Sequence, residues 1–460
     1  MPRDAAERGV VPVAPEPISQ STPAQRWLAR LSFVLAAAAI AIVVVFAGVK
    51  SLGMLAVGLV AAAVTLAAAF FFLARRGVLR WLSAAVFVLA PVVVLVVYAV
   101  EDLLWIAIVS AAAWALAVVT GRAALSGEVA EWRMPEHPAQ PPAQHPYLIM
   151  NPKSGGGKVV KFNLKQRAED QGAEVFLMET AEPVDVADVA RKAVAMGADL
   201  LGVAGGDGTQ ALVAAVAAEH DIPFLVISAG TRNHFALDLG LDRENPAACL
   251  DALRDGVELR VDLGLIGGQT FVNNASFGAY AEIVETPEYR GDKRGTTLNT
   301  LPDLLQGHRG ARLVARADGV EITAPQALLV ANNPYGTGDI AGLGRRVRLD
   351  GGVLGVVGVK VGTAGQAVGL LQGRRSTGLT VLTAKNIEID ADVPRIPVGI
   401  DGEAVSLPTP VQCAIRPGAL RVWVPRDRPG VIPPKPQVSW ARLKQLAGPP
   451  TRALGAVPIA

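Results

Sequence analysis

Four long stretches without a charged residue occupy most of the first quarter of the 460-residue chain. At about 1.5 Å of helical rise per residue, a stretch of this length crosses a hydrocarbon core of roughly 30 Å. A cleaved signal sequence has a single, shorter apolar core. The sequence therefore predicts a four-helix transmembrane segment within residues 27–122, and no Asp, Glu, Lys, Arg or His inside these spans marks an ion path. The spans are Leu31–Val49, Ser51–Ala74, Trp81–Val100 and Leu103–Gly121.

The basic residues beside these spans predict their orientation. Arginines precede the first span, separate the second from the third and follow the fourth, whereas the other two connections hold only Lys50 and the pair Glu101 and Asp102. Cytoplasmic connections carry the excess of Lys and Arg. We therefore expect a plasma-membrane protein whose residues 1–26 form a cytoplasmic tail and whose chain beyond residue 122 is also cytoplasmic. The arginines are Arg26, Arg30, Arg75, Arg76, Arg80 and Arg122.

The composition excludes several classes of protein. Hydrophobic residues make up 51% of the chain and charged residues 18%, which is too apolar for a disordered chain. The 43 basic and 41 acidic residues nearly cancel, so nucleic acid is not an expected partner. Two cysteines and five histidines argue against a disulfide scaffold and against a metal centre built from Cys or His.

Beyond the spans, the sequence divides into four segments. Residues 123–145 are rich in proline and predict an extended linker. Residues 146–245 alternate buried-strand and helix patterns, which is typical of an α/β nucleotide-binding domain with a parallel sheet. Residues 246–426 contain short glycine-rich strands and predict a mainly antiparallel β-sandwich domain, interrupted by helices near 299–306 and 364–372. Residues 427–460 form a Pro-rich tail.

The first strand of the α/β domain is followed by a glycine loop. Consecutive glycines expose backbone N–H groups and allow a phosphate to approach, while Lys153 and Lys158 add positive charge before a helix. An ordinary glycine-rich turn between a strand and a helix is the alternative. The candidate phosphate-binding residues in this loop are Asn151, Pro152, Lys153, Ser154, Gly155 and Gly156.

Two further glycine loops follow later strands of the same domain. Ligands bind at the carboxyl ends of strands in open α/β sheets, so three such loops at one edge indicate a nucleotide-phosphate cleft. In the second loop we expect Thr209 to cap the next helix and Asp207 to contact the nucleotide or Mg²⁺. The candidate residues are Gly205, Gly206, Asp207, Gly208 and Thr209 in the second loop, and Gly230, Thr231 and Asn233 in the third.

The order of these motifs resembles a known family. Asn-Pro-x-Ser-Gly, then Gly-Gly-Asp-Gly-Thr, then Gly-Thr-x-Asn, with a late Asp-Gly-Glu, is similar to the diacylglycerol kinase catalytic-domain family, which includes sphingosine, ceramide and bacterial lipid kinases. The resemblance runs from Tyr147 to Val424 and leaves the membrane segment outside. It implies ATP binding between the two domains, a lipid-substrate role for residues 246–426, and transfer of the γ-phosphate to a lipid hydroxyl. Two departures are His234, where members commonly carry Asp, and Gln210-Ala211, where many members have Leu-Asn.

The late Asp-Gly-Glu supplies the candidate catalytic residues, Asp401 and Glu403. Phosphoryl transfer needs a residue that accepts the hydroxyl proton and usually Mg²⁺ on the phosphates. Residues two apart in an extended strand share a face, so Asp401 and Glu403 are expected to form a carboxylate pair in which repulsion raises the proton affinity of one member. The alternative is a plain hairpin with Asp-Gly at its tip.

Three further segments carry weaker predictions. Residues 272–278 and 332–336 resemble family segments, and residues 349–352 resemble a segment that lies near a structural metal in some members. Because Gly355 stands where a second acid is often found there, that metal is not predicted. Two basic clusters are candidates for anionic headgroups, although a solvated face is the more common explanation. They are Arg345, Arg346 and Arg348, and Arg290, Lys293 and Arg294.

Taken together, these features favour a membrane-anchored lipid kinase that uses ATP and Mg²⁺ and acts on a lipid of the bilayer. An enzyme similar to NAD kinase also carries Gly-Gly-Asp-Gly-Thr, but the spans and the Gly-Thr-x-Asn loop oppose it. A membrane protein that senses nucleotide or lipid without turnover is the other alternative. The sequence does not identify the acceptor lipid, because acceptor pockets depend on tertiary shape.

Overall fold

The computed structural model describes most of the chain as two compact units. We call them the helical unit, drawn from residues 1–72, 77–132 and 433–460, and the sheet unit, drawn from residues 73–76 and 133–432. The helices expected near 299–306 and 364–372, and the cluster Arg290, Lys293 and Arg294, lie outside the described residues. The described residues are 22–47, 50–75, 77–125, 134–139, 141–178, 184–278, 281, 311–335, 345–346, 348–360, 379–431 and 440–448.

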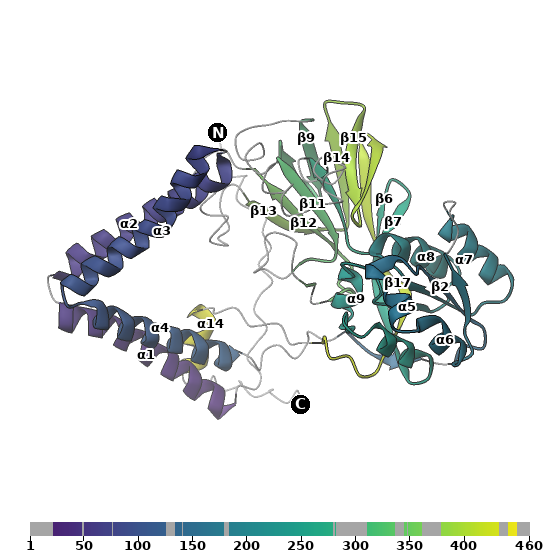
Figure 1. Cartoon of the computed structure of the whole chain (residues 1–460), viewed down its shortest axis with the longest axis horizontal. Helices are drawn as coiled ribbons and strands as arrows, with labels where there is room; N and C mark the ends of the chain where they lie inside the picture. Colours follow the sequence, from purple (N-terminus) through teal and green to yellow (C-terminus); the bar gives the residue numbers. More distant parts are fainter. Residues whose placement is uncertain are drawn as a thin grey trace, which may run out of the picture. The chain divides into compact units, whose positions relative to one another are not determined.

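Four long helices make up most of the helical unit (Figure 1). Among the described residues, these four are long and apolar enough to cross a membrane. Each contains most or all of one predicted span. The first helix, α1, begins at Pro23, so it also includes Arg26 and Arg30. The helices are α1 (Pro23–Ala47), α2 (Lys50–Ala74), α3 (Val78–Val100) and α4 (Leu104–Leu125).

A fifth helix, α14 (Trp440–Ala447), belongs to the same unit although it lies near the other end of the chain. It falls within the segment 427–460, for which the sequence predicted only a Pro-rich tail. Its buried Leu443 and Leu446 form one apolar cluster with Ala29 of α1 and with Ala124 and Leu125 of α4. The tail therefore includes an ordered element that packs on the apolar helices.

Four parallel strands form one part of an 11-stranded sheet in the sheet unit. Their order is β5-β4-β2-β3, and every residue of β5, β4 and β2 is buried. The strands are β2 (Pro146–Met150), β3 (Glu174–Leu177), β4 (Leu200–Ala204) and β5 (Phe224–Ile227), and the helices between and after them are η3 (Ser154–Gly156), α5 (Lys158–Lys161), α6 (Leu164–Glu169), α7 (Val186–Ala195), α8 (Asp207–Glu219), α9 (His234–Asp238) and η4 (Pro246–Leu253).

The same sheet continues into the second half of the unit through β17 (Val411–Pro425), which pairs in parallel with β5. Strand β6 (Gly256–Ile266) pairs antiparallel with β17 along nearly its whole length. Side chains from both strands, including Leu259 and Trp423, lie in the core of the α/β half. The remaining strands are β1 (His137–Pro138), β7 (Gln269–Phe271), β9 (Leu313–Ala317), β10 (Val320–Thr323) and β14 (Asn386–Ala391).

A separate six-stranded antiparallel sheet completes the unit. Its inner side chains and those of β9 and β14 share one hydrophobic core, so the two sheets form a sandwich. The predicted fold class, with apolar helices followed by an α/β domain and a mainly antiparallel β-sandwich, is confirmed. The strands, in sheet order, are β13 (Leu379–Ala384), β12 (Leu354–Val359), β11 (Ala327–Asn332), β8 (Asn274–Gly278), β15 (Arg395–Ile400) and β16 (Glu403–Pro408).

Candidate active site

The three glycine loops begin at one edge of the parallel sheet. Strands β2, β4 and β5 are neighbours, and their last residues, Met150, Ala204 and Ile227, are paired in register. Because parallel strands all end on the same side of a sheet, register pairing of their last residues brings the loops that follow them together. This is the placement that the sequence motifs required.

Contacts between the loops are so close that they require glycine. A Cβ atom on Gly155 would lie 2.2 Å from the carbonyl oxygen of Ala229, so the first loop is pressed against the third. A Cβ atom on Gly230 would lie 2.7 Å from the carbonyl oxygen of Gly205, so the third loop is pressed against the second. Gly155 also has φ of +56°, a left-handed conformation that other residues adopt only at a cost. The three loops therefore pack directly against one another, with the third loop in contact with both the first and the second.

The glycines on the other side of these loops face open space. A Cβ atom on Gly156 or Gly206 would meet no other heavy atom within 4 Å. Gly206 is the N-cap residue of α8, and no side chain caps the first turn of that helix. The prediction that Thr209 caps this helix is wrong, because the helix begins at Asp207 and Thr209 lies inside its first turn. The uncapped N–H groups and the positive end of the helix dipole are a suitable site for a phosphate.

Asn233 shapes its own loop. Its side-chain oxygen accepts the N–H of Gly230 at 2.9 Å, and its side-chain nitrogen donates to the carbonyl oxygen of Gly230 at 2.8 Å. The side chain is fully buried. Asn151 has a comparable role in the first loop, where its side chain accepts the N–H of Lys153 at 3.0 Å and its own N–H donates to Ala204. These two amides hold the loops in shape, which leaves exposed groups such as Lys153 and Thr231 to meet a ligand.

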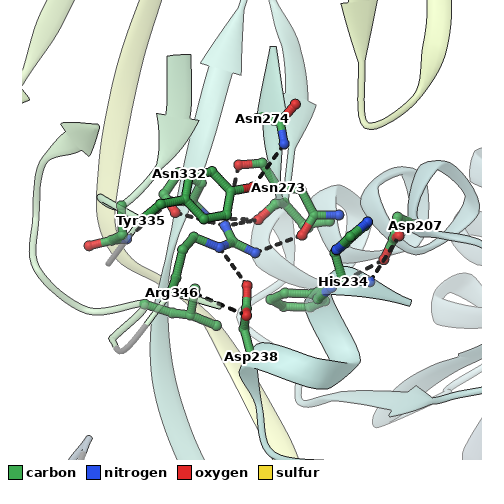
Figure 2. A network of polar contacts seen from close by, with 12 residues as sticks. Asp207, His234, Asp238, Asn273, Asn274, Asn332, Tyr335 and Arg346 are labelled. Carbon is green, nitrogen blue, oxygen red and sulfur yellow. Dashed lines mark hydrogen bonds and ion pairs between the residues drawn. The ribbon is translucent and has the colours of Figure 1, made fainter. Parts of the chain in front are cut away.

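Asp207 connects the second loop to the helix that follows the third (Figure 2). Its two carboxylate oxygens accept the N–H groups of His234 at 3.1 Å and Phe235 at 3.2 Å, which lie in the first turn of α9. The carboxylate therefore caps α9 and is largely buried. A carboxylate has about four acceptor sites, so these two bonds leave capacity for at least one more partner.

Asp401 lies at the tip of the hairpin that joins β15 to β16. Asp401 and Gly402 both have positive φ, +47° and +89°, as a two-residue type I′ turn requires. The carboxylate turns back toward the start of β8 and accepts three backbone N–H groups, from Val272 at 2.8 Å, Asn273 at 2.8 Å and Asn274 at 3.0 Å. Asp401 therefore lies at the tip of one hairpin and, through these hydrogen bonds, also holds the start of a second strand, β8.

Removal from water raises the pKa of Asp401 to about 7, and the negative charge of Asp207 adds to this rise, while the three N–H groups oppose it. The expected pairing of Asp401 with Glu403 in an extended strand is not observed, because Asp401 is in the turn. The carboxylate that acts on Asp401 is instead Asp207, from the other half of the unit. Glu403 is exposed, and its Cγ lies 3.2 Å from where a Cβ atom on Gly208 would be. The hairpin tip therefore reaches the second glycine loop.

Arg346 is the centre of a buried polar network that joins the two halves of the unit (Figure 2). The interpretation of Arg346 as part of a solvated basic face is wrong, since its side chain is fully buried. Its Nε donates to Asp238 at the end of α9 at 2.6 Å, and its Nη2 donates to the side-chain oxygen of Asn273 at 2.6 Å. Its Nη1 donates to the carbonyl oxygens of Val272 and Asn332, each at 2.7 Å.

This network connects the phosphate loops to the candidate base. Asp207 holds the first turn of α9, and Asp238 at the other end of α9 holds Arg346. Arg346 in turn holds the segment 272–274, whose N–H groups hold Asp401. Burial raises the pKa of Asp238 and the Arg346 guanidinium opposes that rise. Sequence reasoning missed Asp238 and gave Arg346 a different role, and no local pattern could have paired them, because they lie 108 residues apart.

His234 lies beside Asp207 in this network (Figure 2). Burial lowers the pKa of its imidazole below 6.5, although the charges of Asp207 and Asp238 act in the opposite direction. His234 is therefore largely neutral at pH 7. It adds neither a positive nor a negative charge beside the glycine loops.

The segment that resembles the metal-binding region of some family members is held together by hydrogen bonds. The buried carboxylate of Asp262 accepts the N–H groups of Gly352 at 2.6 Å and Gly418 at 2.7 Å. Asp350 is paired with Arg348, with two oxygen–nitrogen distances of 2.8 Å. Among the described residues, no group of three or more His, Cys, Asp or Glu side chains is arranged to hold a metal ion.

Three glycine loops at the carboxyl edge of a parallel sheet, facing a hairpin from an adjoining β-sandwich, are typical of α/β proteins that bind phosphate groups. Comparison with known proteins narrows this class. Residues 145–266 match the diacylglycerol kinase catalytic domain. The predicted resemblance to the diacylglycerol kinase catalytic-domain family is thereby confirmed.

Curated relatives agree with this match. A Mycobacterium tuberculosis protein named Diacylglycerol kinase is 37% identical over 120 residues, which cover 26% of this chain and 39% of the relative. A Bacillus subtilis protein of the same name is 36% identical over 166 residues, covering 35% of this chain and 53% of the relative. The chain thus spans about half or less of the length of these two relatives.

Two longer matches each cover about three fifths of the chain. A Pseudomonas aeruginosa protein named "Probable lipid kinase YegS-like" is 28% identical over 305 residues, covering 61% of this chain and 95% of the relative. A crystal structure of a candidate diacylglycerol kinase from Bacillus anthracis has a TM-score of 0.50 at 23% identity and covers 62% of this chain and 99% of that chain. This second likeness concerns the fold alone.

Proposed function

We propose that the chain is a membrane-anchored lipid kinase that transfers the γ-phosphate of ATP to the hydroxyl group of a diacylglycerol-like or sphingoid-like membrane lipid. The proposal rests on one observation, which is that the glycine loops and the Asp401 hairpin lie close together. Three glycine loops lie at one sheet edge, where the first turn of α8 has no side-chain cap, and the Asp401 hairpin from the adjoining half reaches the second of these loops. The names of the relatives support a kinase, and the acceptor lipid and the use of ATP are part of the proposal.

The loops fit the phosphates of a nucleotide. Gly156 and Gly206 leave open space where a side chain would otherwise stand, and the first turn of α8 offers backbone N–H groups to an anion. Lys153 and the exposed Thr231 are the side chains of the first and third loops that we assign to the phosphates. The remaining predicted residues would shape this surface: Asn151, Pro152, Ser154, Gly155, Gly205, Gly208, Thr209, Gly230 and Asn233.

The described side chains do not form a metal site by themselves, but they fit Mg²⁺ carried by the nucleotide. In kinases Mg²⁺ is commonly held by one or two carboxylates together with the substrate phosphates. Asp207 has acceptor capacity left after capping α9 and is the residue that we assign to this ion. When bound, Mg²⁺ would neutralise charge on the phosphate oxygens.

Asp401 is the proposed general base. With a pKa of about 7, close to half of its carboxylate is ionised at pH 7, and the ionised form can accept the proton of the lipid hydroxyl. The hydroxyl oxygen then forms a bond to the γ-phosphorus while the bond from that phosphorus to the β–γ bridging oxygen breaks, which leaves ADP. The three N–H groups that Asp401 accepts fix its position for this transfer. Glu403 lies beside Gly208 and would adjust the charge near the same loop.

The helical unit supports action at a membrane. We propose that α1 to α4 span the plasma membrane, with the arginine-rich ends of the helices and the sheet unit in the cytoplasm. A lipid with two chains cannot leave the bilayer readily, so an enzyme that phosphorylates it has to work at the membrane surface. The four apolar helices would keep the sheet unit there.

A binding protein without turnover is the second candidate. It is favoured by the observation that Asp207 and Asp401 both use their carboxylates to hold backbone N–H groups. Such residues could serve only to stabilise the fold around a bound nucleotide. An enzyme similar to NAD kinase would instead release a water-soluble phosphorylated product.

The test is phosphate transfer from radiolabelled MgATP to a total membrane-lipid extract, using the full chain in lipid vesicles and mass spectrometry of the products. The lipid kinase predicts lipids that gain one phosphate, and Asp401→Asn should reduce their formation by about 10²–10⁴-fold. A matched control is Asp318→Asn, because Asp318 also precedes a glycine and has φ of +44° but lies on another hairpin. Nucleotide binding without labelled lipid would favour the sensor, and label only in water-soluble product would favour the NAD kinase-like enzyme.

A further inference from the structure

The C-terminal helix α14 is amphipathic and is docked on the apolar helices. Leu443 and Leu446 lie three residues apart on one face and are 0% and 2% exposed. Lys444 and Gln445 are exposed. A helix with one apolar and one polar face has to bury its apolar face on another surface. For α14, that surface is formed by α1 and α4.

The receiving surface is shaped for this helix. A Cβ atom on Gly121 of α4 would lie only 3.0 Å from Cδ1 of Leu443, so a larger residue would push the leucine away. The ring of Trp440 lies 5.7 Å from that of Phe33 on α1 and 5.8 Å from that of Trp114 on α4, measured between centroids. Contacts with both helices mean that α14 packs over the pair rather than on one helix.

The end of α14 is also held by a charged group. Nε of Arg30 donates to the carbonyl oxygen of Ala447 at 3.1 Å. Ala447 is the last residue of α14, where carbonyl groups lack helical partners and a positive charge is favourable. Arg30 belongs to the arginine-rich end of α1 that the orientation rule assigns to the cytoplasm. Thus α14 docks at the same end of the helices from which the chain leaves α4 at Leu125.

We infer that α14 is a second tether, which attaches the C-terminal end of the sheet unit to the helical unit, so that the sheet unit is held at both of its ends. The first tether is the short segment between Leu125 and the start of the sheet unit at Arg133. A unit held at two points has a smaller range of positions than a unit held at one point. This restriction would keep the candidate active site near the membrane surface, and that last consequence rests on the proposed function.

The tether itself can be tested without any activity measurement. A protease site is inserted between residues 126 and 133 of the full chain in vesicles, the first tether is cut, and the vesicles are pelleted. The wild-type sheet unit should stay with the vesicles, whereas Leu443→Asp, which puts a charge into the buried face of α14, should release it. Gln445→Asp is the matched control, because it adds the same charge on the exposed face and should be retained.

A second variant does not depend on the strength of docking. Gly121→Cys combined with Leu443→Cys should form a disulfide under oxidation, and after the cut the two units should then migrate together on a non-reducing gel. The natural Cys249 and Cys413 are each 1% exposed and should not interfere. Formation of this cross-link supports the docking, and release of the wild-type sheet unit or retention of the Leu443→Asp sheet unit would overturn the inference. Cutting engineered sites in both tethers must release the part of the sheet unit formed by residues 133–432, and its retention would show that another surface holds it.

The effect on reaction rate is a separate measurement. Leu443→Asp should reduce phosphorylation of vesicle lipid by roughly tenfold and leave phosphorylation of a short-chain lipid dispersed in detergent unchanged. If neither lipid is phosphorylated even by the wild type, the proposed function fails while the retention result still decides the tether. Equal loss on both lipids would contradict the link between the tether and the membrane surface.

Discussion

Replacement of Arg346 by Met tests whether the buried network holds the two halves of the sheet unit together. Methionine has a similar length but no charge and no hydrogen-bond donor. The variant would leave the Asp238 carboxylate, whose side chain is 3% exposed, without its cation. It would also remove the donors that hold the carbonyl oxygens of Val272 and Asn332.

The expected loss of stability follows from this burial. Breaking a buried ion pair by removing one partner typically costs about 3–5 kcal/mol, because the remaining charge is left unpaired. With roughly 2–4 °C per kcal/mol for domains of a few hundred residues, the melting temperature should fall by about 6–20 °C. Arg426→Met is the control, since the Arg426–Asp255 pair is 62% and 72% exposed and such pairs contribute only about 0–1 kcal/mol.

The assay is thermal unfolding of the full chain in detergent, followed by near-ultraviolet circular dichroism. Arg346→Met combined with Asp238→Asn should recover part of the loss, because the double variant leaves no unpaired buried charge. A melting temperature of Arg346→Met within about 3 °C of the wild type, or a double variant less stable than either single one, would refute the view that Arg346 and Asp238 act as a pair.

Three other predictions concern the loops and the candidate base. If Asp401 is the general base, the wild-type rate of lipid phosphorylation should rise with pH to a plateau, with a midpoint near 7. The Asp401→Asn variant should lose this rise. A wild-type rate that does not change between pH 5.5 and 8 would exclude this role for Asp401. The raised pKa also means that the folded state binds a proton more tightly than the unfolded chain, whose Asp pKa is about 3.9, so the stabilisation from Asp401 is complete below about pH 4 and is lost as pH rises through 7. Melting temperatures measured from pH 4 to 8 should therefore decline more steeply for the wild type than for Asp401→Asn, and parallel curves would contradict the shift. Gly155→Ala should weaken ATP binding at least tenfold in calorimetry, because its Cβ would lie 2.2 Å from a carbonyl oxygen of the third loop, whereas Gly172→Ala, with φ of +84° but open space around it, should bind ATP like the wild type.

The sequence alone was sufficient for features that depend on local pattern. The four apolar helices follow from runs of uncharged residues, and the parallel strands follow from short apolar runs alternating with helix patterns. The glycine loops also follow from the local sequence. Each of these turns needs glycine, either because backbone atoms approach closely or because the space beside the backbone has to stay open. Since the carboxyl ends of parallel strands share an edge, the convergence of the three loops also follows from the order of strands and loops along the chain.

Only the tertiary structure decided which polar groups face one another. Asp207 caps α9, and Arg346 lies buried between Asp238 and the segment 272–274, although the sequence pattern for Arg346 suggested a solvated face. Likewise, β17 joins the parallel strands to the antiparallel strands of the same sheet, and α14 returns to the first helices from the far end of the chain. Each of these contacts joins residues remote in sequence, and such pairing is determined by how complete elements pack, which neither hydrophobic periodicity nor a motif records.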